Sequence, residues 1–222
     1  MRGLFTRIAG RYDALNRVLT CGLDVTWRRR ALAWLAPPAR VLDLATGTGD
    51  LALALARRFP RARVTGLDLT PAMLAVARRR AARAGVGRRV ALVEGRADAL
   101  PFPDGAFDAV TCAFGFRNFP DPKAALAEAA RVLAPGGALL VLEFFRPGSR
   151  LCGWATSAWL RLVAPLAARG ARADYAYLRI SIARMCPAQT FAAWARAAGF
   201  SATRAAFFLP ACHALAFRAP GA

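Results

Sequence analysis

Short apolar runs alternate with amphipathic stretches along most of the chain. The apolar runs are too short for buried helices and are bounded by glycine or polar residues, as is typical of strands in a covered sheet. We expect such strands at residues 41–45, 63–69, 89–95, 107–114 and 138–145. Helical spacing of apolar residues between these runs predicts helices at residues 50–59, 71–85 and 122–137.

The order of these elements indicates the fold class. Strands that are apolar throughout and alternate with helices form parallel sheets covered on both faces. One more helix is expected at residues 187–199, and strand candidates follow at residues 201–209 and 213–219, joined tightly enough for a hairpin. A mostly parallel sheet closed by a C-terminal antiparallel hairpin is the outline of the class I S-adenosylmethionine-dependent methyltransferase fold, an α/β Rossmann-like fold.

A length of 222 residues suits one domain with a substantial core, so we expect a single domain over residues 1–222. Residues 1–36 and 146–186 lie outside the alternating pattern. We expect them to form an N-terminal helical cover and a helical insert over the substrate site. Apolar residues of the insert, among them Trp154 and Trp159, either line a channel, rest on a bilayer surface or pack in the core.

The formal net charge is +19, which has two interpretations. One is attraction to nucleic acid or to an anionic membrane surface. The other is compositional, because Lys123 is the sole lysine and the arginines, including the runs at residues 28–30 and 78–80, are spread along helical patterns. We favour the compositional interpretation and expect no nucleic-acid partner, with a membrane surface as the stronger functional alternative.

We expect no signal peptide, because the first residues lack a continuous apolar stretch. Arg161 and Pro165 interrupt the best candidate for a membrane span, residues 151–170. The five cysteines lack a CxxC pair and there is one histidine, so we expect reduced thiols and no metal site. We therefore expect a cytoplasmic protein. Peripheral contact with the inner face of the membrane and homo-oligomerisation stay open.

A glycine loop, DLATGTGD at residues 43–50, lies where the first strand turns into the first helix. Glycines there let backbone approach a ligand, and the helix N-terminus offers free N–H groups. Gly47 and Gly49, followed by Ala52, also fit the dinucleotide-binding fingerprint, with Asp68 about 20 residues on for a ribose. The loop alone therefore leaves an NAD(P)-dependent oxidoreductase open.

Three carboxylates near the loop favour a different ligand. Asp50 follows the glycines and would repel a pyrophosphate, whereas Asp43 and Asp50 would attract a cationic sulfonium with an amino group. Asp68 ends the second strand, where a carboxylate accepts both hydroxyls of a ribose. A ligand with these parts is S-adenosylmethionine, and residues 100–102 of the loop at 95–108 would wall its adenine. Purely structural roles as caps and turn formers are the alternative.

Three longer segments resemble one family. They are FTRIAGRYDALNRVLTCGLDVTWRR at the N-terminus, FGFRNFPDPKAALAEAARVLAPGGALLVLEFFRPG in the middle and DYAYLRISIARMCP before the last helix. Together they resemble signatures of the ubiquinone/menaquinone biosynthesis C-methyltransferases, which methylate prenylated benzoquinols or demethylmenaquinol. The resemblance covers almost the whole chain and implies a prenylated quinol substrate with S-adenosylmethionine as cofactor.

The resemblance also implies site residues. The family's cofactor contacts fall on Thr48, Asp68, Arg96, Ala97 and Ala113. Beside the resemblance, the composition of the glycine loop itself makes Asp43, Gly47 and Gly49 candidates, and Asp98 is a candidate for the adenine. Two positions depart from related enzymes. Many carry an acid where Arg96 stands, which leaves Asp98 or backbone to accept the adenine amino group, and family members often carry serine where Ala113 stands. Substrate contacts are expected from Tyr12, Asp13, Asn16 and Tyr175.

Arg117 and Asn118 follow the fourth strand directly and are expected to point into the substrate cavity beyond the strand ends. There they would stabilise the phenolate of a quinol whose ring carbon attacks the methyl group. Capping of the helix near Pro122 is the alternative. The proton acceptor stays open between His213, Tyr12, Asp13, Tyr175 and a water held by Arg117. Demethylmenaquinol is the preferred acceptor, with a polyprenyl benzoquinol or another small aromatic or lipid acceptor as alternatives.

Overall fold

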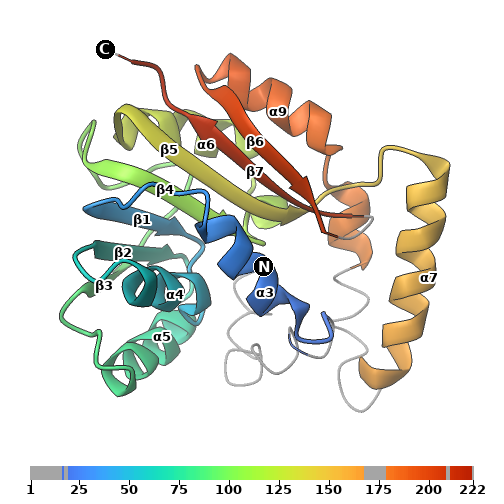
Figure 1. The fold of residues 1–222 in the computed structure, drawn as a ribbon, viewed down its shortest axis with the longest axis horizontal. Helices are drawn as coiled ribbons and strands as arrows, with labels where there is room; N and C mark the ends of the chain where they lie inside the picture. The colour runs from blue at the N-terminus through green and yellow to red at the C-terminus, as the bar shows by residue number, and fades with distance from the viewer. Residues whose placement is uncertain (1–16, 18–19, 168–178, 209–210, 222) are drawn as a thin grey trace.

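A computed structural model describes residues 17, 20–167, 179–208 and 211–221. Its centre is a seven-stranded sheet with the order β3-β2-β1-β4-β5-β7-β6, in which β7 runs antiparallel to its neighbours β5 and β6 (Figure 1). The strands are β1 (Arg40–Leu44), β2 (Arg63–Asp68), β3 (Val90–Glu94), β4 (Phe107–Ala113), β5 (Leu133–Phe144), β6 (Ser201–Phe207) and β7 (Cys212–Arg218). The parallel sheet and the C-terminal hairpin predicted from the sequence are confirmed.

Helices precede, connect and follow these strands. They are α3 (Leu23–Leu32), α4 (Asp50–Arg58), α5 (Pro71–Arg83), the short 3₁₀ helix η1 (Phe116–Asn118), α6 (Pro122–Val132), α7 (Arg150–Ala167) and α9 (Ala188–Ala197). The prediction of a helix over residues 122–137 was too long. Pro135 disfavours helical backbone at the residue before it, and the chain enters β5 at Leu133 instead.

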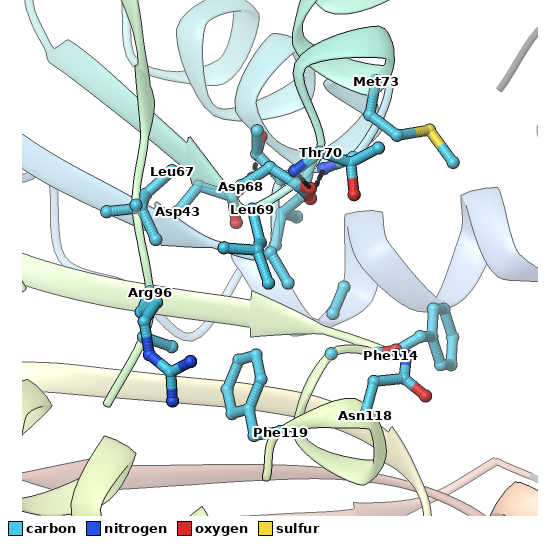
Figure 2. A pocket seen from close by; sticks show the side chains of 18 of the residues that line it. Asp43, Leu67, Asp68, Leu69, Thr70, Met73, Arg96, Phe114, Asn118 and Phe119 are labelled. Atoms are coloured by element: carbon cyan, nitrogen blue, oxygen red, sulfur yellow. Dashed lines mark hydrogen bonds between the residues drawn. The ribbon is translucent and has the colours of Figure 1, made fainter. Parts of the chain in front are cut away.

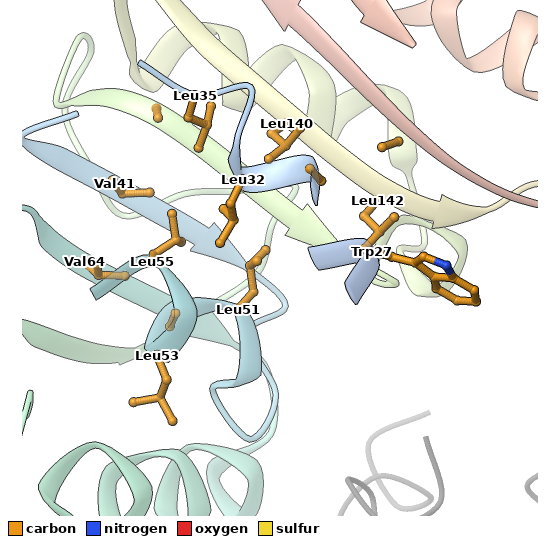
Figure 3. Close-up of a cluster of buried hydrophobic side chains, with 14 of the residues drawn as sticks. Trp27, Leu32, Leu35, Val41, Leu51, Leu53, Leu55, Val64, Leu140 and Leu142 are labelled. Carbon is orange, nitrogen blue, oxygen red and sulfur yellow. The ribbon is translucent and has the colours of Figure 1, made fainter. Parts of the chain in front are cut away.

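Both faces of the sheet are buried, as the apolar strands predicted. Successive side chains of β1 point to opposite faces, so Val41 packs in one cluster and Leu42 in the other. The first cluster joins the sheet to α3, α4 and α5, and Figure 3 shows Trp27 and Leu32 of α3 within it. The second joins the sheet to α6 and α9. The core is thus a three-layer sandwich, which fixes the strand ends that form the site.

The helices that the structure describes include none that is long and apolar enough to cross a membrane. The best candidate for a membrane span in the sequence, residues 151–170, lies mainly in α7, which the structure describes over residues 150–167.

Candidate active site

A pocket opens beyond the carboxyl ends of β1, β2 and β4 (Figure 2). Open α/β sheets bind ligands at this edge, on either side of the point where the strand order reverses. Here β1 lies between β2 and β4. The loops that follow β1 and β4 therefore start side by side and border the same crevice. Eight of the nine predicted cofactor residues line the pocket: Asp43, Gly47, Thr48, Asp68, Arg96, Ala97, Asp98 and Ala113.

The loop after β1 has an unusual backbone. Ala45, Gly47 and Gly49 all have positive φ angles, of 50°, 56° and 88°. Left-handed backbone costs a residue with a Cβ about 1–2 kcal/mol, so Ala45 is held there by its surroundings. Gly49 does not line the pocket. It precedes α4, and a Cβ on it would lie 3.2 Å from Ala77 of α5, so it serves helix packing instead.

Asp43 anchors this loop from beneath. Its carboxylate is buried and accepts hydrogen bonds from the hydroxyls of Thr46 at 2.7 Å and Thr111 at 2.8 Å. Burial raises the pKa of Asp43 to about 6, although the two hydroxyls favour the charged form. Asp43 lines the pocket, and its first effect is to fix the backbone of the loop that faces a ligand.

Asp68 closes β2 and lies at the pocket wall, as predicted. One carboxylate oxygen accepts a hydrogen bond from the N–H of Gly47 at 2.9 Å and the other from the N–H of Thr70 at 2.8 Å. Burial raises the pKa of this carboxyl above its ordinary value. Each oxygen can accept more than one hydrogen bond, so Asp68 holds the glycine loop and still offers acceptors to a pair of ribose hydroxyls.

The loop after β3 forms the next part of the pocket. Arg96 and Asp98 make a bidentate ion pair, with Nε–Oδ1 and Nη2–Oδ2 distances of 2.9 and 2.6 Å. Ala97 is buried between them. Residues 100–102, expected to wall an adenine ring, do not line the pocket, so that expectation was wrong: Leu100 lies in the core and Phe102 packs edge-on against Phe107. Leu69 and Phe119 provide apolar surface instead.

The carboxylate of Asp50 is not the isolated negative charge that the sequence suggested. It lies 2.6 Å from Nη2 of Arg80, 3.1 Å from Nη2 of Arg17 and 3.5 Å from Nη1 of Arg28. Burial opposes ionisation, but these guanidinium groups outweigh it and lower the pKa of Asp50. Asp50 therefore does not act as the predicted repulsive charge toward a pyrophosphate, because its charge is compensated within the protein.

Asn118 and Arg117 occupy different environments, although both were expected in the substrate cavity. Asn118 lines the pocket, and its Nδ2 donates to the carbonyl of Phe114 at 3.4 Å (Figure 2). Arg117 is not among the pocket-lining residues. Its guanidinium lies inward, 2.5 Å from Oε1 of the fully buried Glu143, because a buried carboxylate needs an opposite charge. The structure thus places Asn118 at the pocket, whereas Arg117 lies behind it and does not point into it as predicted.

His213, the candidate proton acceptor among the described residues, lies away from the pocket. His213 lies in β7 and packs edge-on against Phe145 and Phe207, at ring centroid distances of 5.6 and 5.0 Å. Burial lowers the pKa of its imidazole, and it does not line the pocket. The four predicted substrate residues, Tyr12, Asp13, Asn16 and Tyr175, lie outside the described residues.

The pocket also contains residues that sequence reasoning missed. Arg28 lines it from α3, and Phe114 does so after β4 with a φ of +60°. The sequence carried one signal for Arg28, since Asp24 stands four residues before it on the same helix face. No sequence signal marks the left-handed backbone of Phe114, because that conformation is imposed by the surrounding structure.

The arrangement suits S-adenosylmethionine. Asp68 offers a ribose acceptor, and Leu69 and Phe119 give the pocket apolar surface. A Cβ on Gly47 would meet no atom closer than 4.0 Å, so the loop backbone is open to a ligand. The cofactor residues that the structure brings together therefore fit the three parts of this molecule: adenine, ribose and amino acid.

Comparisons with known proteins agree with this geometry. Residues 1–213 match the ubiE/COQ5 methyltransferase family. The chain is 51% identical over 203 residues to a demethylmenaquinone methyltransferase of Thermus thermophilus, covering 89% of this chain and 91% of the relative. It is 41% identical over 205 residues to a ubiquinone/menaquinone biosynthesis C-methyltransferase of Paracoccus denitrificans, covering 90% and 82%.

Solved structures share the fold. A SAM-dependent methyltransferase from Thermotoga maritima superposes with a TM-score of 0.69 at 22% identity, over 98% of this chain and 99% of that one. The fold is thus that of class I S-adenosylmethionine-dependent methyltransferases, the cofactor is S-adenosylmethionine, and an NAD(P)-dependent oxidoreductase is not favoured. The chain is an enzyme of the ubiE/COQ5 methyltransferase family.

Proposed function

We propose that this enzyme methylates a ring carbon of demethylmenaquinol, a prenylated naphthoquinol, to give menaquinol. The observation that carries the proposal is the 51% identity to a demethylmenaquinone methyltransferase across nine-tenths of both chains. The relative named for both ubiquinone and menaquinone biosynthesis is less similar, at 41%. A polyprenyl benzoquinol is therefore the second candidate acceptor.

When bound, S-adenosylmethionine supplies an electrophilic methyl group. The protein has to hold a nucleophilic ring carbon in line with that group, and positioning of this kind lowers a barrier by several kcal/mol. The ring carbon becomes nucleophilic when the neighbouring hydroxyl loses its proton. An amide N–H that faces the resulting oxygen stabilises the negative charge without reorganisation. Asn118 is the predicted side chain that lines the pocket with such a donor.

Arg117 acts in this scheme from behind the pocket. Its guanidinium is held by Glu143 and lies over the rings of Phe114 and Phe144, 5.8 Å from each centroid. Phe114 lines the pocket and its carbonyl accepts from Asn118. We therefore assign Arg117 a positioning role for Phe114 and Asn118, with its positive charge adding long-range stabilisation of a phenolate.

We also propose that residues 1–36 and 146–186 cover the substrate side of the pocket within one domain. The helix α7 of the second segment exposes Leu151 at 75% and Trp154 at 71%. Exposed tryptophan beside leucine, on a protein of net charge +19, suits the surface of an anionic bilayer, where a prenylated substrate resides.

The membrane contact has its own test. Leu151→Ser with Trp154→Ser should abolish co-sedimentation with phosphatidylglycerol vesicles at low salt. Val25→Ser, which changes an exposed apolar residue of α3, should leave it intact. Loss of self-association in the double variant, with vesicle binding unchanged, would show that α7 contacts another copy of the chain instead.

The acceptor is tested by quinone analysis of a strain that lacks the gene. Mass spectrometry should show accumulation of demethylmenaquinone and loss of menaquinone, restored by the wild-type gene. Accumulation of a desmethyl benzoquinone would assign the enzyme to ubiquinone biosynthesis, and an unchanged quinone profile would overturn the proposal.

A further inference from the structure

Arg28 is a buried cation in the wall of the cofactor pocket. It lies in α3, its exposed fraction is 7%, and it lines the pocket with residues of the glycine loop. Its Nη1 forms ion pairs with Asp24 and Asp50. Its Nε is buried and has no hydrogen-bond partner among the described residues. A buried N–H without an acceptor is unfavourable, and a ligand oxygen would satisfy it.

Arg28 belongs to a cluster of charged side chains at the pocket wall. Asp24 and Asp50 form ion pairs with three guanidinium groups, those of Arg17, Arg28 and Arg80. Arg28 also favours the charged form of the nearby Asp43 carboxyl, whose pKa burial raises to about 6. These ion pairs involve Nη1 of Arg28 and leave its Nε edge for a ligand oxygen.

The place of Arg28 along the pocket identifies which part of a ligand it meets. Its guanidinium lies 5.3 Å from the ring centroid of Phe114. Figure 2 shows Phe114 and Arg96 on opposite sides of the pocket, with Asp68 between the two in the direction along the strands. With the ribose at Asp68 and the adenine toward Arg96, the amino-acid end of S-adenosylmethionine extends toward Phe114, the glycine loop and Arg28.

We propose that Arg28 binds the α-carboxylate of the methionine part of S-adenosylmethionine through its Nε edge. Nη1 is engaged with Asp24 and Asp50, and the edge that carries Nε is the one that grips carboxylates in a bidentate manner. The inference rests on the assigned cofactor and adds a recognition residue to its site. A phenolate of the acceptor is the other anionic oxygen within the reaction, and binding measurements without acceptor separate the two.

The test compares two ligands that differ by one group. Calorimetry without quinol measures the affinity for S-adenosylmethionine and for decarboxylated S-adenosylmethionine, which lacks the α-carboxylate. Wild-type protein should bind the decarboxylated ligand roughly ten- to hundredfold more weakly, as expected for a charge-assisted hydrogen bond. Arg28→Met should bind S-adenosylmethionine weakly and no longer distinguish the two ligands.

Two further variants make the result specific. Arg28→Lys keeps the positive charge near Asp24 and Asp50 but lacks Nε, so it should fold like the wild type and lose most of the discrimination. Arg29→Met changes the exposed neighbour on the same helix and should discriminate as the wild type does. Thermal unfolding without ligand checks that each variant is folded.

Three outcomes would contradict the inference, and a fourth would refute the cofactor assignment on which it rests. Equal affinity of wild-type protein for both ligands would overturn it, as would equal weakening of both ligands in Arg28→Met, which indicates a structural role. Discrimination unchanged in both Arg28 variants would do the same. Failure of wild-type protein to bind either ligand would instead refute the cofactor assignment, which is a separate result.

Discussion

Arg117 and Glu143 form an ion pair in the interior, with 2.5 Å between Nη1 and Oε1 and exposed fractions of 7% and 0%. Glu143 lies near the end of β5 and also accepts a hydrogen bond from the backbone N–H of Arg117 at 3.2 Å. The strand thus fixes η1, the 3₁₀ helix that carries Asn118. The pair connects a central strand of the sheet to the pocket wall.

Removal of one partner of this pair should be strongly destabilising. Glu143→Gln or Arg117→Met each leaves a buried charge without its counterion, at a cost of about 3–5 kcal/mol. The double variant should lose less than the sum of the two, because no charge is then left unpaired. Urea denaturation of all four proteins measures the coupling, and additive losses would show that the ion pair contributes nothing.

The same pair should govern turnover more than cofactor affinity. Glu143→Gln misplaces η1, and therefore Asn118, without touching the residues that hold ribose and adenine. We expect a lower kcat with S-adenosylmethionine affinity close to that of the wild type. Equal losses in both would mean that the pair supports the cofactor pocket as a whole.

Asp43 makes stability depend on pH in an unusual direction. Burial raises its pKa from 3.8 to about 6, so the folded protein binds this proton more tightly than the unfolded chain. The free energy of unfolding therefore falls as pH rises from about 4 to 6, by about 3 kcal/mol from this group. Asp43→Asn removes the contribution, because an amide stays neutral.

Denaturation of wild type and Asp43→Asn at several pH values tests this. The stability of the variant relative to the wild type should rise through the window from pH 4 to 6 and level off above it. Thr111→Val removes one hydrogen bond that favours the charged form, so it should move the window upward. A stability difference independent of pH would refute the raised pKa.

Asp68 should be needed for cofactor binding and not for folding in general. Its two carboxylate oxygens accept hydrogen bonds from the N–H groups of Gly47 and Thr70, and they face the ribose site. Asp68→Asn replaces one of these acceptors by an NH₂ group, which then faces another donor. We expect roughly ten- to hundredfold weaker binding of S-adenosylmethionine by calorimetry. Glu94→Gln is the matched control, because Glu94 stands beside Asp68 in the sheet at the end of β3 and outside the pocket.

Gly115 is a steric requirement of the site. A Cβ on it would lie 2.6 Å from Sγ of Cys112 and 2.8 Å from Cβ of Ala45, in the loop that faces the cofactor. Gly115→Ala should cost about 1–3 kcal/mol and weaken cofactor binding, because Ala45 has to move. Gly153→Ala, where a Cβ meets nothing within 4 Å, is the control for the substitution itself. Equal stability of the two variants would contradict this account.

The sheet could be predicted from the sequence because its strands are buried on both faces and are unbroken apolar runs. The end of the helix before β5 was predicted too late, because Pro135 stops a helix and the prediction ran past it. The sequence predicted Asp68 and Asn118 because both follow strands whose ends meet at one edge. The inward turn of Arg117 depends on Glu143, 26 residues away, so a local pattern does not show it.

The pattern of polar and apolar residues was least informative about which charged side chains are buried. The run of arginines at residues 28–30 resembles a solvated helix face, and only the fold shows that Arg28 is buried while Arg29 and Arg30 are exposed. A glutamate inside the apolar run of β5 was a readable sign of a buried ion pair, since such a charge needs a partner.

The most direct test of the central claim is methyl transfer by the purified enzyme. The enzyme is mixed with S-adenosylmethionine carrying a ¹³C-labelled methyl group and a short-tailed demethylmenaquinol, kept reduced, and the product is examined by mass spectrometry and NMR. We expect the label on the unsubstituted ring carbon that lies between the prenyl-bearing carbon and a carbon bearing a quinol oxygen. Label on oxygen, or no transfer while S-adenosylmethionine binds, would contradict the proposed function.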